Sequence, residues 1–122
     1  MTYVYSRLIG VLVNNATATS DLPTAASAAD LSLTKGHSRT LWVCGPKTGT
    51  WAGTVTIYTT PDKKGWENVA LKTYSVDQSN PTISEDIITA RSFFGAAFSL
   101  DSGSLGSADA DGRTGVSVFV EG

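Results

Sequence analysis

The stretch of sequence that decides the fold is residues 50–69, which read TWAGTVTIYTT, then PDKKG, then WENV. β-Branched residues fill the first part, and the Pro-Asp-Lys-Lys-Gly segment is typical of a turn. Val55 and Ile57 alternate with more polar neighbours, so one face of the first strand suits a core. This pattern predicts a β-hairpin from Trp51 to Tyr74 at the centre of the fold.

Short segments with alternating side chains, separated by turn residues, follow throughout the rest of the chain. Together with the hairpin they predict about eight strands. Loops are predicted at 15–29 with one helical turn, at 76–85 as a crossing connection, and at 101–115 as a mobile or partner-ordered segment. Gly95 is expected to end a strand. The predicted strands lie at 2–14, 31–34, 38–45, 51–60, 66–75, 86–94, 96–100 and 116–120.

This organisation predicts one domain, residues 1–122, with an all-β fold. The regular spacing of strands and turns favours an antiparallel β-sandwich, jelly-roll-like, over other classes. A small closed barrel has the same periodicity and is the alternative.

The composition excludes several classes of function. The net charge is −2 and only nine residues are Lys or Arg, so we expect no nucleic-acid partner. Cys44 is the only cysteine, so neither an intrachain disulfide nor a zinc site made of thiolates can form. The apolar run Leu8–Val13 is too short for a secretion signal, and no segment reaches the ~18 apolar residues that cross a bilayer. We therefore expect no membrane partner.

The residues that could carry chemistry are few and are not arranged for it. His37 is the only histidine and reads as an exposed turn residue without an orienting partner. The neighbouring acids Glu85 and Asp86 read as solvated charges rather than as a glycosidase pair. Asp109 and Asp111 resemble the start of a calcium loop, but no further acid completes the ligand set. We expect no catalytic residue, no cofactor and no metal site, and so no enzyme.

Five aromatic residues offer an alternative function. A sandwich surface with exposed aromatic rings can stack on sugar rings, although tryptophans more often fill a core. A carbohydrate-binding module is therefore the alternative interpretation. The residues concerned are Trp42, Trp51, Tyr58, Trp66 and Tyr74.

The first predicted strand is apolar on both faces, and this suggests an interface between subunits. Val4, Leu8 and Leu12 fall on one face of it and a second apolar set falls on the other, so both faces need cover. We expect a homo-oligomer with residues 1–14 as a possible intersubunit strand and the single charge of the run at its rim. The second face holds Tyr3, Tyr5, Ile9, Val11 and Val13, and the predicted interface residues are Tyr3, Tyr5, Arg7, Ile9 and Val11.

The order of landmarks resembles that of small β-sandwich structural proteins of tailed-phage virions. The resemblance covers roughly Leu41 to Val120. It rests on Leu41-Trp42-Val43, the run from Trp51 to Ile57, the turn from Asp62 to Gly65, Trp66, Val69, Ile88 with Arg91, and the closing strand Gly115–Val120.

This resemblance implies a non-catalytic protein located in the virion. The main role that it implies is that of a capsid decoration (cement) protein that binds the capsid lattice. A tail or spike component for host attachment is an alternative. The implied partners are other virion proteins of the capsid or tail. Because a capsid lattice has threefold positions, the expected oligomer is a trimer.

Overall fold

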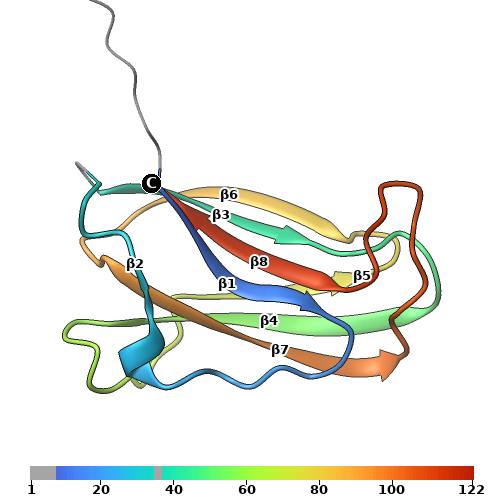
Figure 1. The fold of residues 1–122 in the computed structure, drawn as a ribbon, viewed down its shortest axis with the longest axis horizontal. Helices are drawn as coiled ribbons and strands as arrows, with labels where there is room; N and C mark the ends of the chain where they lie inside the picture. Colours follow the sequence, from blue (N-terminus) through green and yellow to red (C-terminus); the bar gives the residue numbers. More distant parts are fainter. Residues whose placement is uncertain (1–7, 35–36) are drawn as a thin grey trace, which may run out of the picture.

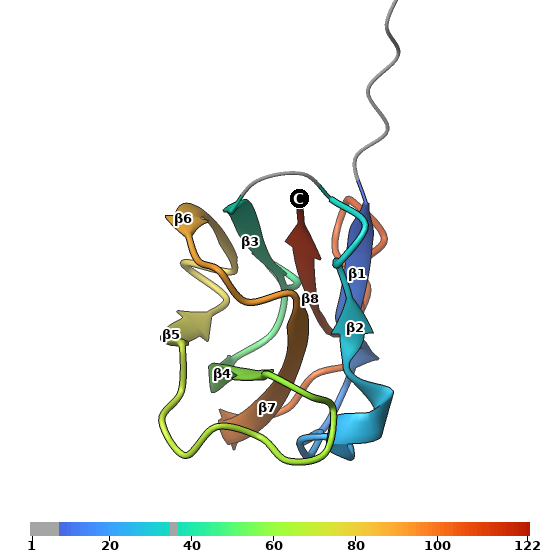
Figure 2. The same ribbon diagram turned by 90° about the vertical axis from the view of Figure 1, so that its left-hand side faces the viewer.

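The computed structural model describes residues 8–34 and 37–122 as two antiparallel sheets packed face to face (Figures 1 and 2). Sheet A has the strand order β1-β8-β3-β6, and sheet B has the order β2-β7-β4-β5. The strands are β1 (Ile9–Ala16), β2 (Ala29–Asp30), β3 (Ser38–Cys44), β4 (Trp51–Thr60), β5 (Lys72–Asp77), β6 (Thr82–Ile88), β7 (Phe93–Gly103) and β8 (Val116–Glu121), and a short 3₁₀ turn, η1 (Ala25–Ser27), precedes β2.

This strand order is that of a jelly roll, in which two Greek keys fold into paired sheets. The predicted all-β sandwich is confirmed, and the two separate sheets decide against a closed barrel. Within the described part of the chain, no helix is long and apolar enough to cross a membrane.

The space between the sheets is filled by large apolar side chains from both. Trp51 and Phe98 pack edge to face, with ring centroids 6.5 Å apart. The indole Nε1–H of Trp51 donates to the carbonyl oxygen of Pro46 at 3.1 Å, so the polar atom of this buried ring is satisfied. Other core side chains are those of Leu31, Leu41, Val43, Val55, Ile57, Phe94, Val116, Val118 and Val120.

The hairpin of β4 and β5 is present, but its second strand begins later than predicted. Ile57 lies opposite Lys72, where β5 starts, so the predicted start at Trp66 is wrong. Glu67 ties the connecting segment to Thr59 at the end of β4. The Thr59 hydroxyl donates to the Glu67 carboxylate at 2.6 Å, and the Glu67 backbone N–H donates to the Thr59 carbonyl oxygen at 3.0 Å.

Strand β7 continues through Gly95, so the prediction that this residue ends a strand is wrong. Gly95 pairs with Tyr58 of β4. The indole ring of Trp66 lies against Gly95 so closely that a Cβ there would overlap it, and the Trp66 Nε1–H donates to the carbonyl oxygen of Pro23 at 2.7 Å. The glycine marks a close approach within a continuous strand, not a break.

Two further predicted strands are not present as predicted. The segment 86–94 contains the end of β6 and the start of β7, because the chain passes from sheet A to sheet B at residues 89–92. The strand predicted at 31–34 is wrong. Residues 31–34 form a turn in which the Thr34 N–H donates to the Leu31 carbonyl oxygen at 3.1 Å, and the short strand β2 precedes it.

The predicted loops are present with shorter bounds. The helical turn expected within residues 15–29 is η1. The crossing loop predicted at 76–85 is reduced to residues 78–81, and the loop predicted at 101–115 to residues 104–115. In both places a neighbouring strand stays paired for longer than the alternation of side chains indicated.

Gly53 provides a test of the core packing. We expect Gly53→Ala to lower the free energy of unfolding by about 1–3 kcal/mol, because the added methyl group would overlap the Phe98 ring and lie 2.8 Å from the Ser99 carbonyl oxygen. Chemical denaturation of the two proteins measures the difference. Gly65→Ala is the matched control, since a Cβ at Gly65 has no neighbour within 4 Å. Equal denaturation midpoints for the Gly53 variant and the parent would contradict this packing.

Candidate functional site

The acidic neighbours Glu85 and Asp86 point to opposite faces of sheet A. Glu85 faces the second sheet, where its Oε1 accepts a hydrogen bond from the Tyr74 hydroxyl at 2.8 Å and lies 3.0 Å from the Lys72 ammonium. Asp86 lies on the outer face and accepts a hydrogen bond from the Thr40 hydroxyl at 2.8 Å. The two carboxylates therefore cannot act together on one substrate.

The contact of Glu85 with Tyr74 joins the two sheets where β6 and β5 are neighbours. The hydrogen bond from Tyr74, followed by the interaction with Lys72, lowers the pKa of Glu85 below its ordinary value of 4.5. Burial of the ring, and then the hydrogen bond to Glu85, raise the pKa of Tyr74. The hydrogen bond between Tyr74 and Glu85 therefore contributes to both pKa shifts.

Asp109 organises the loop of residues 104–115. One carboxylate oxygen accepts the backbone N–H groups of Asp111 and Arg113, both at 2.9 Å, and the other accepts that of Lys47 at 3.1 Å. These backbone donors, that of Arg113 first, lower the pKa of Asp109. Its carboxylate is thus used by the loop itself. Within residues 8–34 and 37–122, no group of three or more His, Cys, Asp or Glu side chains could hold a metal ion.

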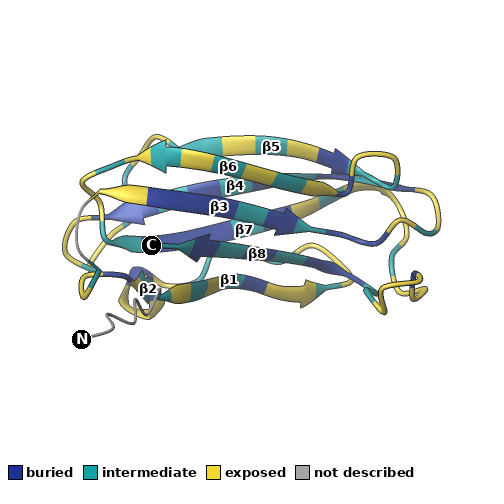
Figure 3. Cartoon of the chain, turned by 90° about the horizontal axis from the view of Figure 1, so that it is seen from above, coloured by how far each residue is buried: buried dark blue, intermediate teal, exposed yellow. Residues whose placement is uncertain are grey.

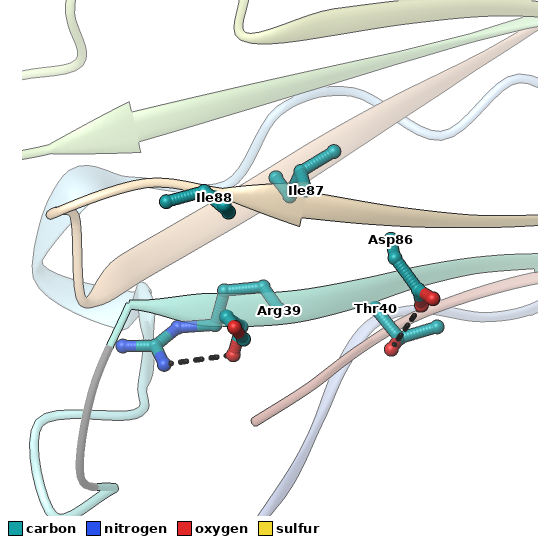
Figure 4. A pocket seen from close by; sticks show the side chains of 6 residues that line it. Arg39, Thr40, Asp86, Ile87 and Ile88 are labelled. Carbon is teal, nitrogen blue, oxygen red and sulfur yellow. Dashed lines mark hydrogen bonds between the residues drawn. The ribbon is translucent and has the colours of Figure 1, made fainter.

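An open pocket of about 440 Å³ lies at the ends of β3 and β6 (Figure 4). The side chain of Arg39 is only 2% exposed, and its guanidinium donates to the carbonyl oxygens of Ser38 at 3.3 Å and Arg91 at 3.5 Å. Burial lowers the pKa of Arg39. His37 is exposed beside it. The lining residues are Ser38, Arg39, Thr40, Asp86, Ile87 and Ile88, among which no nucleophile is paired with a base.

The five aromatic residues considered for sugar binding do not form one platform. Trp51 is in the core, and the Tyr74 hydroxyl faces Glu85 between the sheets. Tyr58 and Trp66 lie on the outer side of sheet B. Tyr58 pairs with Gly95 in the ladder, and the Trp66 ring lies against Gly95. Trp42 lies on the outer face of sheet A. Of the five, only Tyr58 and Trp66 lie on one surface.

The outer face of sheet A carries an apolar row, which we define as Val11, Phe119 and Trp42. These residues are opposite one another on β1, β8 and β3. Val11 is 54% exposed, and the other two are half-buried. The indole Nε1 of Trp42 is covered by its surroundings and has no hydrogen-bond partner within the described residues. Figure 3 shows sheet A from this side, with more and less buried positions alternating along β6 and β8.

The predicted interface residues fall into two groups. Ile9 and Val11 lie on β1 and are 62% and 54% exposed. Tyr3, Tyr5 and Arg7 lie outside the described residues.

Val13 is not on the exposed face as predicted, since it is only 4% exposed and packs into the core. A bulge between Val11 and Val13 shifts the register against β8 and turns Val13 inward.

Sequence reasoning missed Phe119 and Trp42 as members of this surface. Alternation within each strand does place both residues on the face opposite the core. Their position beside Val11 depends on the register of β8 against β1 and β3, and those strands are far apart in the sequence.

Comparisons with protein-family models, with curated proteins and with solved structures find no match for this chain.

Glu85 gives a pH-dependent prediction. We expect Glu85→Gln to lower the free energy of unfolding at neutral pH by about 0.2–1 kcal/mol, the range for accessible ion pairs. The pKa of Glu85 is lowered in the folded state. The stabilisation of the fold by its carboxylate is therefore fully present above about pH 4.5 and is lost as the pH falls through the folded-state pKa. The difference between the variant and the parent should therefore shrink below about pH 4.5 in denaturant titrations.

The control for this experiment is Tyr74→Phe, alone and combined with Glu85→Gln. We expect the two substitutions to be non-additive, since they remove two sides of one hydrogen bond. A difference between parent and Glu85→Gln that stays constant from pH 7 to pH 3 would contradict the assigned role of the carboxylate.

Proposed function

We propose that this protein is a non-catalytic structural subunit of a virion, in its first version a capsid decoration protein that binds the capsid lattice. The observation that supports this proposal is the apolar row on the outer face of sheet A. A face of this kind suits contact with another protein, because exposed apolar side chains in register lose unfavourable contact with water when they are covered. Binding to other virion proteins and location in the virion belong to the same proposal.

Two further features agree with this proposal. The jelly roll is an architecture used by viral capsid domains, although it is also used by lectins, and a fold alone does not determine function. The carboxylates of Glu67, Glu85 and Asp109 each accept hydrogen bonds within the fold, and these contacts account for them structurally. The proposed activity is therefore assembly rather than chemistry.

A carbohydrate-binding module is the second candidate, and one observation favours it. Trp66 lies against Gly95, which pairs with Tyr58, so two aromatic residues belong to one region on the outer side of sheet B. Aromatic rings held in this way can stack on sugar rings. A tail or spike component for host attachment would combine sugar binding with a place in the virion.

Mass spectrometry of purified particles from the source of the sequence tests the virion proposal. We expect the protein in stoichiometric copies that match a symmetry of the particle, because decoration proteins occupy equivalent lattice positions. Washing the particles in increasing salt is the control for loosely adsorbed protein. Absence from washed particles would overturn the proposal.

A glycan array separates the second candidate from the first. The carbohydrate module predicts binding that is lost in Trp66→Ala and kept in Trp42→Ala, since Trp42 lies on the other sheet. Clear binding with this dependence and no association with particles would replace the virion proposal with the carbohydrate module.

A further inference from the structure

The outer face of sheet B carries short hydroxyl side chains where the outer face of sheet A carries the apolar row. Its middle part consists of two rows that cross β5, β4 and β7. All but one of the side chains in these rows have a hydroxyl group, and none of them is charged. The first row is Thr73, Thr56 and Ala97, and the second is Ser75, Thr54 and Ser99.

An aromatic cluster, which we define as Tyr58, Trp66 and Phe93, borders the two rows at one end. Tyr58 lies opposite Gly95 in the ladder, and the Trp66 ring lies against the same glycine. The hydrogen bond from the Trp66 Nε1–H to the Pro23 carbonyl oxygen fixes the orientation of this ring. All three rings are half-buried, so each keeps an accessible part. Rings that are held before a ligand arrives lose little freedom on binding.

Lys63 adds hydrogen-bond donors at the aromatic end. Its ammonium lies 5.7 Å from the centre of the Phe93 ring. The backbone of Lys63 is left-handed, with φ of 61°, and its N–H donates to the Thr60 hydroxyl oxygen at 3.1 Å. A non-glycine residue in this conformation is strained, and such strain is concentrated at binding sites. The turn thus places a cationic donor beside the rings.

The opposite end of the two rows carries a carboxylate. The Thr54 hydroxyl donates to one oxygen of Asp101 at 2.6 Å, and the Ser99 hydroxyl donates to the other at 2.9 Å. Because each hydroxyl has a single proton, both hydroxyls and the carboxylate offer only acceptor lone pairs to a ligand. Asp101 and Ser99 are exposed. This end therefore favours groups that donate hydrogen bonds and disfavours anions.

We propose that the outer face of sheet B binds a neutral oligosaccharide, which runs along the strands from the aromatic cluster to Asp101. A sugar ring has a face of C–H groups that can stack on aromatic rings, and its hydroxyl groups both donate and accept hydrogen bonds. These properties match the two ends of the face. Thr54 and Tyr58 are four residues apart on β4, so the site is about 13 Å long and suits a chain of sugars.

Other classes of ligand match this face less well. The core of a protein interface is apolar and depleted in serine, whereas the centre of this face consists of hydroxyl groups. A nucleic acid needs a series of Lys or Arg side chains along its phosphates, and its phosphates would be repelled by Asp101. The apolar row of sheet A suits a protein partner, so the two outer faces of the sandwich fit different ligands.

The site rests on the carbohydrate-binding candidate and deepens it, and it does not depend on a location in the virion. It adds to that candidate an acceptor role for Asp101, a preference for neutral sugars and a requirement for a chain of sugars. Each of these additions can fail while the candidate itself stands.

An array of neutral oligosaccharides, from disaccharides to hexasaccharides, together with sulfated and carboxylated chains of the same lengths, tests the site. We expect binding that strengthens with chain length and is about tenfold weaker for the charged chains, because a like charge removes a charge-assisted hydrogen bond at Asp101. Neutral and charged chains of equal length that bind equally well would contradict the preference for neutral sugars.

Variants at the two ends provide the second arm. We expect Trp66→Ala and Asp101→Asn each to weaken binding by about tenfold or more. Asp101 is exposed, so its substitution leaves the core intact if the Trp66 variant fails to fold. The matched controls are Trp42→Ala and Asp86→Asn on the outer face of sheet A, where Asp86 also accepts a hydroxyl hydrogen bond. Both controls should bind like the parent.

The outcomes keep the proposals apart. Binding that requires Trp66 but is the same for Asp101→Asn and for charged chains would overturn this site and leave the carbohydrate-binding candidate in place. Absence of binding to every chain on the array would overturn both. If, in addition, Asp101→Asn removes the protein from washed particles, then another virion protein covers this face and the virion proposal stands.

Discussion

The fold depends on the close contact of two aromatic rings with two glycines in the ladder between β4 and β7. Gly53 leaves room for Phe98 on the core side, and Gly95 leaves room for Trp66 on the outer side. This ladder is the longest in the structure and pairs Trp51 at one end with Gly103 and Thr60 at the other with Phe93. A side chain at either glycine would push the strands or the rings apart. The pair β4 and β7 therefore fixes both the packing of Phe98 in the core and the position of Trp66 in the connection after β4.

The remaining contacts close the sides of the sandwich around that ladder. On one side, Tyr74 of sheet B donates to Glu85 of sheet A. On the other side, Ser20 adds a bridge to β7 beyond the two residues that pair with β2, with paired backbone hydrogen bonds to Phe98 at 2.8 and 2.9 Å. Edge strands with unpaired backbone groups invite association with other chains. These two contacts join the sheets on one side and extend the pairing of β7 on the other.

The sequence predicts the class of the fold well because alternation is a local property. The strands at 38–45, 51–60 and 116–120 have clear alternation and need only small shifts at their ends. The role of Gly95 is not predictable in this way, because a glycine that breaks a strand and a glycine that receives an aromatic ring have the same local pattern. The ring that it receives, Trp66, approaches only once the connection after β4 has folded back.

The candidate surface is predictable only in part, for the same reason. Ile9 and Val11 are identifiable within one strand, but Val13 does not follow them, because a bulge depends on the partner strand and not on the residues of β1 alone. Phe119 and Trp42 join the surface through pairing between distant segments. A single sequence does not show the register between strands, and it is this register that brings the residues of the surface together.

The pairing of Leu8 with Gly122 has a mechanical consequence. These residues exchange backbone hydrogen bonds of 3.2 and 3.0 Å at the same end of sheet A. A force that pulls them apart would load the pairs between β1 and β8 one after another, as in opening a zipper. Tension along β4 and β7 in opposite directions would instead load all the pairs of their ladder together, as in shear. The protein should therefore unfold at a low force when Leu8 and Gly122 are pulled apart, and at a higher force when β4 and β7 are pulled in opposite directions along their length.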